Sequence, residues 1–585
     1  MPGARAQLLI SKTISVDQNI PDRGQYVSSF AWTEHAGLAT ISDVNVTLSL
    51  SSAAGTTMRL GQIYATLTFG TASEGSRTAV LLNREGVTSS SAFGNALSSL
   101  NVTLDDSAAN NIFFATNGTG TFAADGRLGV NPYGARVAYS TNQITAGLAA
   151  LNGEWLSSSV WSLLVADVQA GNTAKLNSWS LQVQGSAPTS GTFDPGEGST
   201  VTGSGSIDST LTTGSGGSRT VSVAEGQSLS LAGGLTGAGT LATAGGGTTL
   251  LAGNSPGFTG TVSVGGTGTT VIASTSALGG GILVQSNGNS TVRFGTAGTI
   301  SNVMSVWKTV FGTNGTTLGG TVTVNNTGFE VVDGSTNTIT GQITGSGGVT
   351  KTGGGMLVLG GAAANNFTGP SVVGTNGGTL FLNKAAGTTA ISGSSIAVHS
   401  GGTLLLGAAN QISESTAVTM AGGTVALGGH DQTVGQLALT ADSIFDFGTA
   451  GGGTSTFTFS GFNTAAYGGV AGLTFSNVGI GSKVVFNADY TGNTTFNAFS
   501  SKVSFSDSTL RSQISFDGGQ TTLTVAAIPD ARVSTAAAVL SILIGWTEAR
   551  RRGKTGSGRG GRWGSRIRIK MKISKDSRIE PGVRP

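Results

Sequence analysis

Apolar and polar residues alternate along much of the chain with a period of two, the spacing of a β-strand with one buried face. Between Asp43 and Leu50 the alternation puts Val44, Val46 and Leu48 on one side. The same pattern recurs in four later segments: 79–83, 100–104, 161–167 and 179–183. Strands of this kind bury one face in a sandwich core. Residues 1–186 are therefore predicted to form a β-sandwich.

A longer repeat occupies residues 220–525. A unit Gly-Gly-Thr-(Leu/Val)-x-Leu recurs with spacings of 24 and 21 residues, beginning at Gly377, Gly401 and Gly422. A longer unit occurs twice in the same internal order, from Leu235 to Phe258 and from Ile343 to Phe367. A period of 20-odd residues with short strands and Gly turns predicts a right-handed parallel β-helix-like region, with one coil per repeat. Gly-rich disorder is the alternative, but Leu, Val and Phe recur in register, unlike in disordered tracts.

Composition agrees with an all-β fold. The 585 residues include 96 Gly and 10 Pro but no Cys. Gly without a Gly-X-Y period excludes collagen, and the lack of Cys excludes disulfides, Cys-ligated metals and thiol catalysis. A Ser/Thr/Gly stretch between the two patterned regions, residues 187–219, is predicted to be a linker.

Charge is distributed unevenly along the chain. Residues 550–585 hold 13 Lys or Arg and two acids, whereas residues 1–549 hold 18 basic and 26 acidic residues, a net charge of −8. An acidic body gives no support to nucleic-acid binding, so we expect no nucleic-acid partner. The tail at 553–585 is predicted to be a disordered, solvated extension; binding to RNA or anionic lipid is the alternative.

A short apolar segment, residues 533–546, precedes this tail, and Arg550, Arg551 and Arg552 follow it. It is shorter than the about 20 residues of a spanning helix. The Arg cluster nevertheless predicts a membrane-directed helix, with Arg on the cytoplasmic side and the β-rich body outside.

Two further regions resemble known families. The N-terminal third is similar to the P domain (Homo B domain) of kexin- and furin-like subtilisin proteases, through Ile20-Pro21-Asp22, Asp43-Val44-x-Val46, Asp105-Asp106-Ser107-Ala108-Ala109, Trp161-x-Leu163-x-Val165-x-Asp167, Gly171, Leu176 and Trp179-Ser180-Leu181. This resemblance implies a jelly-roll that has no catalytic residues of its own. The 220–525 repeats resemble the autotransporter-associated β-strand repeats of bacterial surface proteins.

The C-terminal segment 526–552 resembles the PEP-CTERM sorting signal, through Pro529-Asp530-Ala531, the apolar segment and the Arg cluster. The resemblance implies exosortase-type machinery as a partner, with Pro529, Asp530 and the three Arg as sorting residues. Here the acid after Pro is kept and the second Pro of the motif is absent. The only apolar patch near Met1 is Leu8–Ile10, too short for a signal peptide, so we expect the true start to lie upstream.

Candidate chemistry is sparse. The three histidines, His35, His399 and His430, lie beside no nucleophile segment, and the Gly-x-Ser-x-Gly pattern around Ser255 lacks the strand-to-helix context of a nucleophile elbow. We therefore expect no catalytic residue and no organic cofactor. Acids of the N-terminal region offer the hard oxygen ligands that Ca²⁺ prefers. The candidate calcium ligands are Asp105, Asp106 and Asp167.

These patterns together predict an exported, non-enzymatic structural or adhesion protein of a bacterial cell envelope, anchored in the membrane through residues 533–546. Its predicted partners are the sorting machinery and extracellular polysaccharide or other surface proteins. The alternative is a non-catalytic P-domain portion of a subtilisin-like serine endopeptidase system.

Overall fold

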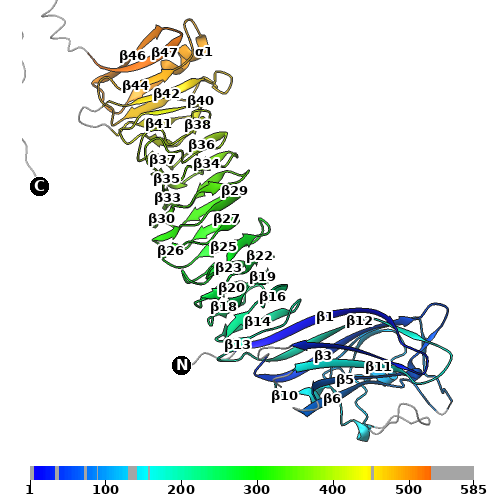
Figure 1. Ribbon diagram of the computed structural model, residues 1–585. Coiled ribbons are helices and arrows are strands. Elements are labelled where there is room, and N and C mark those ends of the chain that lie inside the picture. Colours follow the sequence, from blue (N-terminus) through cyan, green and yellow to red (C-terminus); the bar gives the residue numbers. More distant parts are fainter. Residues whose placement is uncertain are drawn as a thin grey trace, which may run out of the picture. The chain divides into compact units, whose positions relative to one another are not determined.

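The structure is a computed structural model that describes residues 6–32, 38–71, 75–88, 90–128, 141–155, 159–448 and 454–528. Strands make up 53% of the described residues, which contain one α-helix, and this confirms the all-β prediction. Residues up to Ala526 belong to one compact unit. Figure 1 shows N-terminal sheets followed by a stack of short strands. The apolar segment and sorting residues at 529–552, and the tail beyond them, lie outside the described residues.

Two sheets form the N-terminal region. The first has the neighbour order β9-β8-β3-β12-β1 and is antiparallel except between β8 and β9. Its strands are β1 (Gln7–Asn19), β3 (Thr40–Ser52), β8 (Ser99–Leu104), β9 (Thr119–Phe122) and β12 (Ala174–Ser186), with β10 (Gly153–Glu154) beside β3. The second, antiparallel sheet contains β2 (Gln25–Trp32), β11 (Ser159–Asp167), β5 (Ile63–Thr71) and β6 (Gly75–Asn83). Short additions are β4 (Met58–Arg59), β7 (Ala96–Leu97) and the 3₁₀ turns η1 (Leu60–Gln62), η2 (Ile112–Phe114), η3 (Thr141–Gln143) and η4 (Leu148–Leu151).

The two N-terminal sheets pack against each other through the residues that the alternation placed inward. Trp179 of the first sheet lies 5.6 Å, ring centre to ring centre, from Phe30 of the second. Its indole nitrogen donates a 3.0 Å hydrogen bond to the hydroxyl of Ser28, also on the second sheet. Trp161 and Trp179 are both fully buried, so the predicted core strands β11 and β12 supply the largest side chains of this core.

From β13 onward the chain forms a parallel β-solenoid of about 16 turns. Each coil has three faces. Face 1 is the stack on β16, face 2 the stack on β17, and face 3 the strands that follow face 2 in each coil. Along face 1, Val221 pairs with Thr243, Thr243 with Val264 and Val264 with Gln285, so one coil takes about 21 residues. This confirms the period of 20-odd residues and the parallel coil.

The solenoid strands are as follows. On face 1 lie β16 (Ser218–Val223), β19 (Thr240–Gly245), β22 (Thr261–Val264), β24 (Ile282–Gln285), β31 (Ile343–Thr344) and β44 (Lys483–Phe486). On face 2 lie β17 (Ser228–Leu231), β20 (Thr248–Leu251), β23 (Thr269–Ile272), β25 (Thr291–Phe294), β32 (Val349–Thr352), β34 (Ser371–Val373), β36 (Ser395–His399) and β38 (Ala417–Ala421). Five strands run along both faces: β14 (Thr200–Ile207), β27 (Met304–Phe311), β29 (Val322–Val331), β40 (Gln432–Ala441) and β42 (Thr456–Phe462).

Face 3 consists of two sheets. The first contains β13 (Thr192–Phe193), β15 (Thr210–Thr212), β18 (Leu235–Gly237) and β21 (Gly257–Phe258). The second contains β26 (Gly298–Ile300), β28 (Thr316–Leu318), β30 (Thr336–Ile339), β33 (Met356–Leu359), β35 (Gly378–Leu382), β37 (Gly402–Leu406), β39 (Thr424–Ala426), β41 (Ser443–Asp446), β43 (Leu473–Ser476) and β45 (Val503–Phe505).

The coil interior is built from ladders of buried apolar side chains. On face 1 one unbroken ladder pairs six residues of successive coils: Leu241, Val262, Leu283, Met304, Val322 and Ile343. All six are at most 1% exposed. On face 2 the rings of Phe294 and Phe311 stack with centres 5.5 Å apart. No coil covers its own apolar residues, so each depends on the coils above and below it.

The stretch 187–219, predicted as a linker, contains strands. It holds β13, β14 and β15 and the start of β16, and it forms the first coil. β12 ends at Ser186, the predicted boundary, but β1 pairs on one side with β12 and on the other with β14. Composition alone could not distinguish a linker from a coil, because the coil corners are equally rich in Gly and Ser. Val201, Ile207 and Leu211 supply the buried positions that a linker lacks.

The far end of the solenoid is closed by a reversal of chain direction. β46 (Leu510–Asp517) leads into β47 (Gln520–Ala527), and β47 pairs antiparallel with β44. The helix α1 (Thr494–Ser500) is capped by Asn493, whose side chain accepts from the backbone N–H of Phe496. Its Phe499 stacks on Phe462 with ring centres 4.4 Å apart. An aromatic cluster therefore covers the last coil.

A buried lysine interrupts the apolar ladder of face 2. Lys351 pairs with Phe329 below it and Val373 above it, and it is 0% exposed. Its ammonium donates to the carbonyl oxygens of Thr352, Gly353 and Gly377 at 2.8, 2.6 and 2.8 Å. Burial lowers the pKa of Lys351 to about 8, while the nearby carboxylates of Asp333 and Glu330 act in the opposite direction. The lysine thus holds a coil corner together.

Truncating a stacked ring should weaken the solenoid. Phe311→Ala leaves a cavity between coils and is expected to lower the free energy of unfolding by about 3–5 kcal/mol. Lys308→Ala, an exposed change in the same strand, should stay within about 0.5 kcal/mol of the native chain. Urea unfolding followed by circular dichroism measures both, and equal midpoints for the two variants would contradict the ladder as the main source of stability.

Removing the buried ammonium should also be costly. Lys351→Met keeps the length of the side chain but leaves three carbonyl oxygens without this donor, so we expect a loss of about 1–3 kcal/mol. Lys308→Met is the matched control, because its side chain is exposed. The same urea titration compares the two; a Lys351→Met midpoint at or above the native value would show that the ammonium does not stabilise the corner.

Candidate functional site

The structure places the three candidate calcium ligands in two different places. Asp105 and Asp106 follow β8, and each accepts a 2.7 Å hydrogen bond from a different backbone N–H, that of Ser107 and that of Ala149. Partial burial raises the pKa of the nearby Asp43, and the charges of Asp105 and Asp106 raise it further. Asp167 ends β11, where burial raises its pKa and the charge of Asp22 raises it further. The predicted trio is therefore not one site.

Within the described ranges, no three His, Cys, Asp or Glu side chains are grouped so that they could hold a metal ion. Any cation site there has to draw on other oxygen donors, such as amide side chains or backbone carbonyls.

A second charged group lies fully inside the N-terminal core. The guanidinium of Arg127 contacts both carboxylate oxygens of Asp125, at 2.7 Å from Nε and 2.5 Å from Nη2. It also lies over the ring of Phe113, 4.7 Å from its centre. Glu85 accepts a 2.7 Å hydrogen bond from the backbone N–H of Asn83. Burial, together with the carboxylate of Asp125, raises the pKa of Glu85 well above its usual value.

Sequence reasoning missed Glu85 and Arg127. Neither lies in a recognisable motif, and no local signal indicates that they are buried. Asp125 is one of several acids in this region, and nothing in the local sequence shows that Arg127 pairs with it inside the core. The ion pair is fully buried and carries its own hydrogen bonds, so it acts as a packing element of the core.

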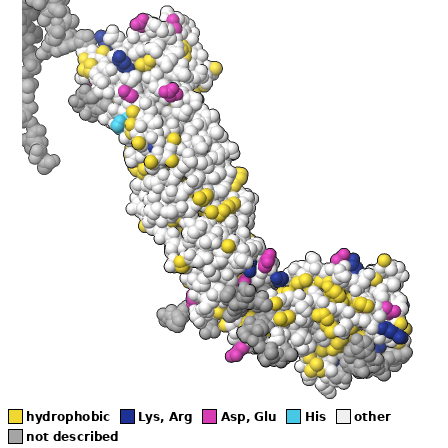
Figure 2. All heavy atoms as spheres, in the orientation of Figure 1, with side chains coloured by type: hydrophobic (Ala, Val, Ile, Leu, Met, Phe, Trp, Pro, Cys, Tyr) yellow, Lys and Arg dark blue, Asp and Glu magenta, His cyan; other side chains and the backbone are white. Residues whose placement is uncertain are grey.

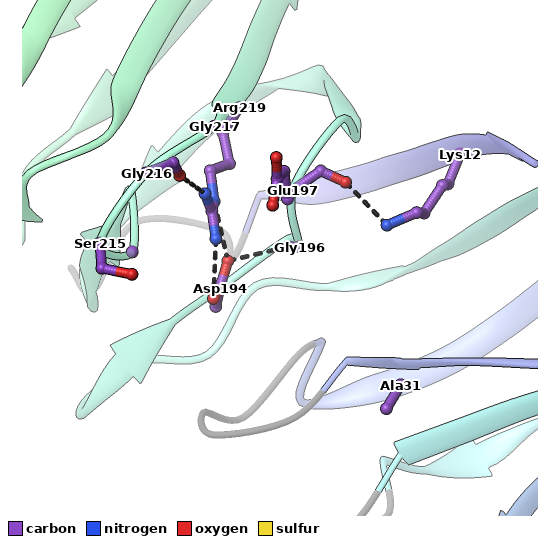
Figure 3. Close-up of a pocket in the computed structure, with 10 residues that line it drawn as sticks. Lys12, Ala31, Asp194, Gly196, Glu197, Ser215, Gly216, Gly217 and Arg219 are labelled. Carbon is purple, nitrogen blue, oxygen red and sulfur yellow. Dashed lines mark hydrogen bonds and ion pairs between the residues drawn. The ribbon is translucent and has the colours of Figure 1, made fainter.

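A polar hollow lies where the N-terminal sheets meet the first coils (Figure 3). It is a hollow of about 590 Å³. Its charged lining comes from Lys12 of β1, from Asp194 and Glu197 after β13, and from Arg219 of β16. The rest is backbone and small side chains, contributed by Ala31, Gly196, Gly214, Ser215, Gly216 and Gly217.

Most charged groups of this hollow are already paired. Arg219 contacts Asp194 at 3.2 Å and donates to the carbonyl of Gly216 at 2.8 Å. The ammonium of Lys12 donates to the backbone carbonyl of Glu197 at 2.7 Å. Burial lowers the pKa of Lys12, and the Glu197 carboxylate opposes the shift. Among the described residues that line the hollow there is no histidine. The bonds of this lining tie β1 to the first coil.

The residues considered for catalysis are apart in the structure. His399 ends β36 on face 2, and His430 follows β39; in the described part of the chain neither is hydrogen-bonded to a serine or a carboxylate. His35 lies outside the described residues. Ser255 is fully buried, and its hydroxyl accepts from the backbone N–H of Leu235 at 2.9 Å, so it stabilises a coil corner.

The comparisons with known proteins add no family. No protein-family model, curated protein or solved structure matches this chain. In the part of the chain that the structure describes, no helix has both the length and the apolar character needed to cross a membrane.

The buried Glu85 should make stability depend on pH. Its folded pKa is raised, so the folded protein holds a proton that the unfolded chain has released, and stability is lost as pH rises from about 4.5 through the folded pKa. Glu85→Gln imitates the protonated form. Its melting temperature, followed by tryptophan fluorescence, should match the native value near pH 4.5 and exceed it near pH 8.

Asp105→Asn provides the control, because that carboxylate is only partly buried. The idea is wrong if the difference between the native chain and Glu85→Gln is the same at both pH values.

Proposed function

We propose that this chain is an exported structural or adhesion protein of a bacterial cell envelope, without a catalytic site of its own. The observation that carries the proposal is the continuous solenoid joined to the N-terminal sheets through β1. With about 4.8 Å between neighbouring strands, 16 coils extend about 75 Å. A stalk of that length would place the N-terminal sheets well away from a cell envelope to which the C-terminal end is anchored.

The surface of the solenoid carries few charges, which supports a binding role that does not depend on strong electrostatic attraction. Between residues 226 and 413 only six residues are charged: Arg293, Lys308, Glu330, Asp333, Lys351 and Lys384. Lys351 and Lys384 are buried. On the face shown in Figure 2, charged side chains lie mainly over the two ends of the solenoid and over the N-terminal sheets. A nearly neutral, hydroxyl-rich surface suits contact with polysaccharide or other surface proteins better than contact with nucleic acid.

The finer parts of the proposal come from the sequence. The N-terminal region would be a P-domain-like jelly-roll, and the solenoid would be right-handed and of the autotransporter-associated type. Residues 533–546 would form the C-terminal hydrophobic helix. Exosortase-type machinery would recognise Pro529, Asp530 and Arg550–Arg552. The apolar run followed by three Arg supports this anchoring.

A second candidate is a non-catalytic part of a subtilisin-like serine endopeptidase system. One observation favours it. Trp161 and Trp179, the two Trp of the P-domain-like closing motif, are buried in the core between the two sheets. Sequencing the gene upstream of Met1 separates the candidates, since the first predicts a short signal peptide and the second several hundred residues of protease.

Fractionation of the native bacterium with intact-mass analysis tests the first candidate. We expect the chain in the envelope or the medium, cut near Pro529 and lacking the Arg-rich tail. Replacing Arg550, Arg551 and Arg552 with Gln should prevent this processing, whereas replacing Arg566 and Arg568, in the tail, should not. A soluble cytoplasmic chain with Met1 and Pro585 both intact would contradict the proposal.

A further inference from the structure

Three chain segments meet at one end of the second N-terminal sheet. They are the turn Pro21–Gly24 between β1 and β2, the 3₁₀ turn η1, and the loop that follows β11. The backbone N–H of Asp167 donates to the carbonyl of Gly24 at 2.9 Å, and that of Val168 donates to the carbonyl of Gln62 at 2.8 Å. The N–H of Gly171 donates to the carboxylate of Asp22 at 3.1 Å. These bonds fix the three segments relative to one another.

Three buried side-chain oxygens in this place have no hydrogen-bond donor. They are Oδ2 of Asp167, Oε1 of Gln62 and Oε1 of Gln169. Asp167 and Gln62 are 0% and 1% exposed. Burying an acceptor without a partner costs about 1–3 kcal/mol, and more for a carboxylate. Such oxygens need a hydrogen-bond donor or a bound cation as a partner.

Two of these side chains bond to the backbone of Gln169, whose own side chain carries the third oxygen. Oδ1 of Asp167 accepts from the backbone N–H of Gln169 at 3.1 Å, and Nε2 of Gln62 donates to the carbonyl oxygen of Gln169 at 3.4 Å. Turning the Gln62 amide over would supply a donor to its surroundings, but it would put Oε1 against that carbonyl, two acceptors with no proton between them. The amide orientation that leaves Oε1 unpaired is therefore the favourable one.

No basic side chain supplies the missing charge. In the described part of the chain, no Lys, Arg or His forms an ion pair with Asp167 or Asp22. Burial raises the pKa of Asp167 to about 6, and the negative charge of Asp22 acts in the same direction. Two carboxylates and two amide oxygens, all hard donors, match the preference of Ca²⁺ for oxygen ligands.

We infer that Asp22, Gln62, Asp167 and Gln169 form a Ca²⁺ site that fastens the three segments together. The site shares only Asp167 with the ligand set predicted from the sequence. Asp105 and Asp106 are not part of it, because they follow β8 and bond to Ser107 and Ala149, outside the three segments. The inference is independent of the proposed surface role, since a calcium-stabilised N-terminal region serves either candidate function.

Calorimetric titration of the full chain, first stripped with EDTA, tests the site. We expect one Ca²⁺ bound at this site and a rise in melting temperature of about 5 °C at saturating Ca²⁺, followed by tryptophan fluorescence. Asp167→Asn should weaken Ca²⁺ binding at least about tenfold. Asp105→Asn, a change to a carboxylate outside the site, should bind as the native chain does.

Gln62→Glu keeps the inference testable if Asp167→Asn fails to fold. It adds a third carboxylate, so it should bind Ca²⁺ more tightly than the native chain and melt at a lower temperature in EDTA. A folded native chain that shows neither binding heat nor a melting shift up to 10 mM Ca²⁺, about tenfold above the dissociation constants of weak extracellular sites, would overturn the site and leave a protonated Asp167 as the explanation. Equal weakening by Asp105→Asn and Asp167→Asn would overturn it too.

Discussion

The structure depends on one constraint: a coil of about 21 residues is too thin to cover its own apolar side chains. Each inward residue is buried only by the residues one coil above and one coil below, as in the face 1 ladder from Leu241 to Ile343. Polar groups at inward positions must therefore find partners inside the stack. Thr243 and Thr270 bond to each other at 2.8 Å, and Lys351 bonds to corner carbonyls. Burial and backbone pairing act along the same axis, so neighbouring coils stabilise each other.

A stack of this kind has two open ends, and unpaired strand edges invite association with other chains. At the first coil β1 occupies the edge of β14, which makes the first N-terminal sheet continuous with the solenoid. Arg219 stands at the foot of the face 1 ladder, directly below Leu241, and its charge is met by Asp194. The polar hollow at this junction is thus a consequence of closing the stack. At the other end β47 pairs with the edge of β44, and the aromatic cluster around Phe462 and Phe499 covers the last coil.

The chemistry of the N-terminal region was only partly predictable. Sequence pattern identified acids as possible ligands, because Asp is a hard donor wherever it occurs. It could not separate Asp105, which bonds to a nearby backbone N–H, from Asp167, whose second oxygen is buried without a donor. The sequence predicts no role for Gln62 or Glu85, because an amide or a single acid outside a motif gives no local indication that it will be buried. Their roles arise from segments that are far apart in the sequence and come together in the fold.

The sequence by itself determined the all-β class, the inward residues of the long strands and the coil period, because these follow from local spacing. The units at Gly377, Gly401 and Gly422 do stack, with Leu380 on Leu404 and Leu404 on Val425. The tertiary structure alone decided which face each repeat takes. Leu235 and Ile343 begin the same sequence unit, yet Leu235 lies on face 3 and Ile343 on face 1. It also decided that residues 187–219 are a coil. All three faces accept the same alternating, Gly-cornered sequence, so only contact with the preceding coil selects among them.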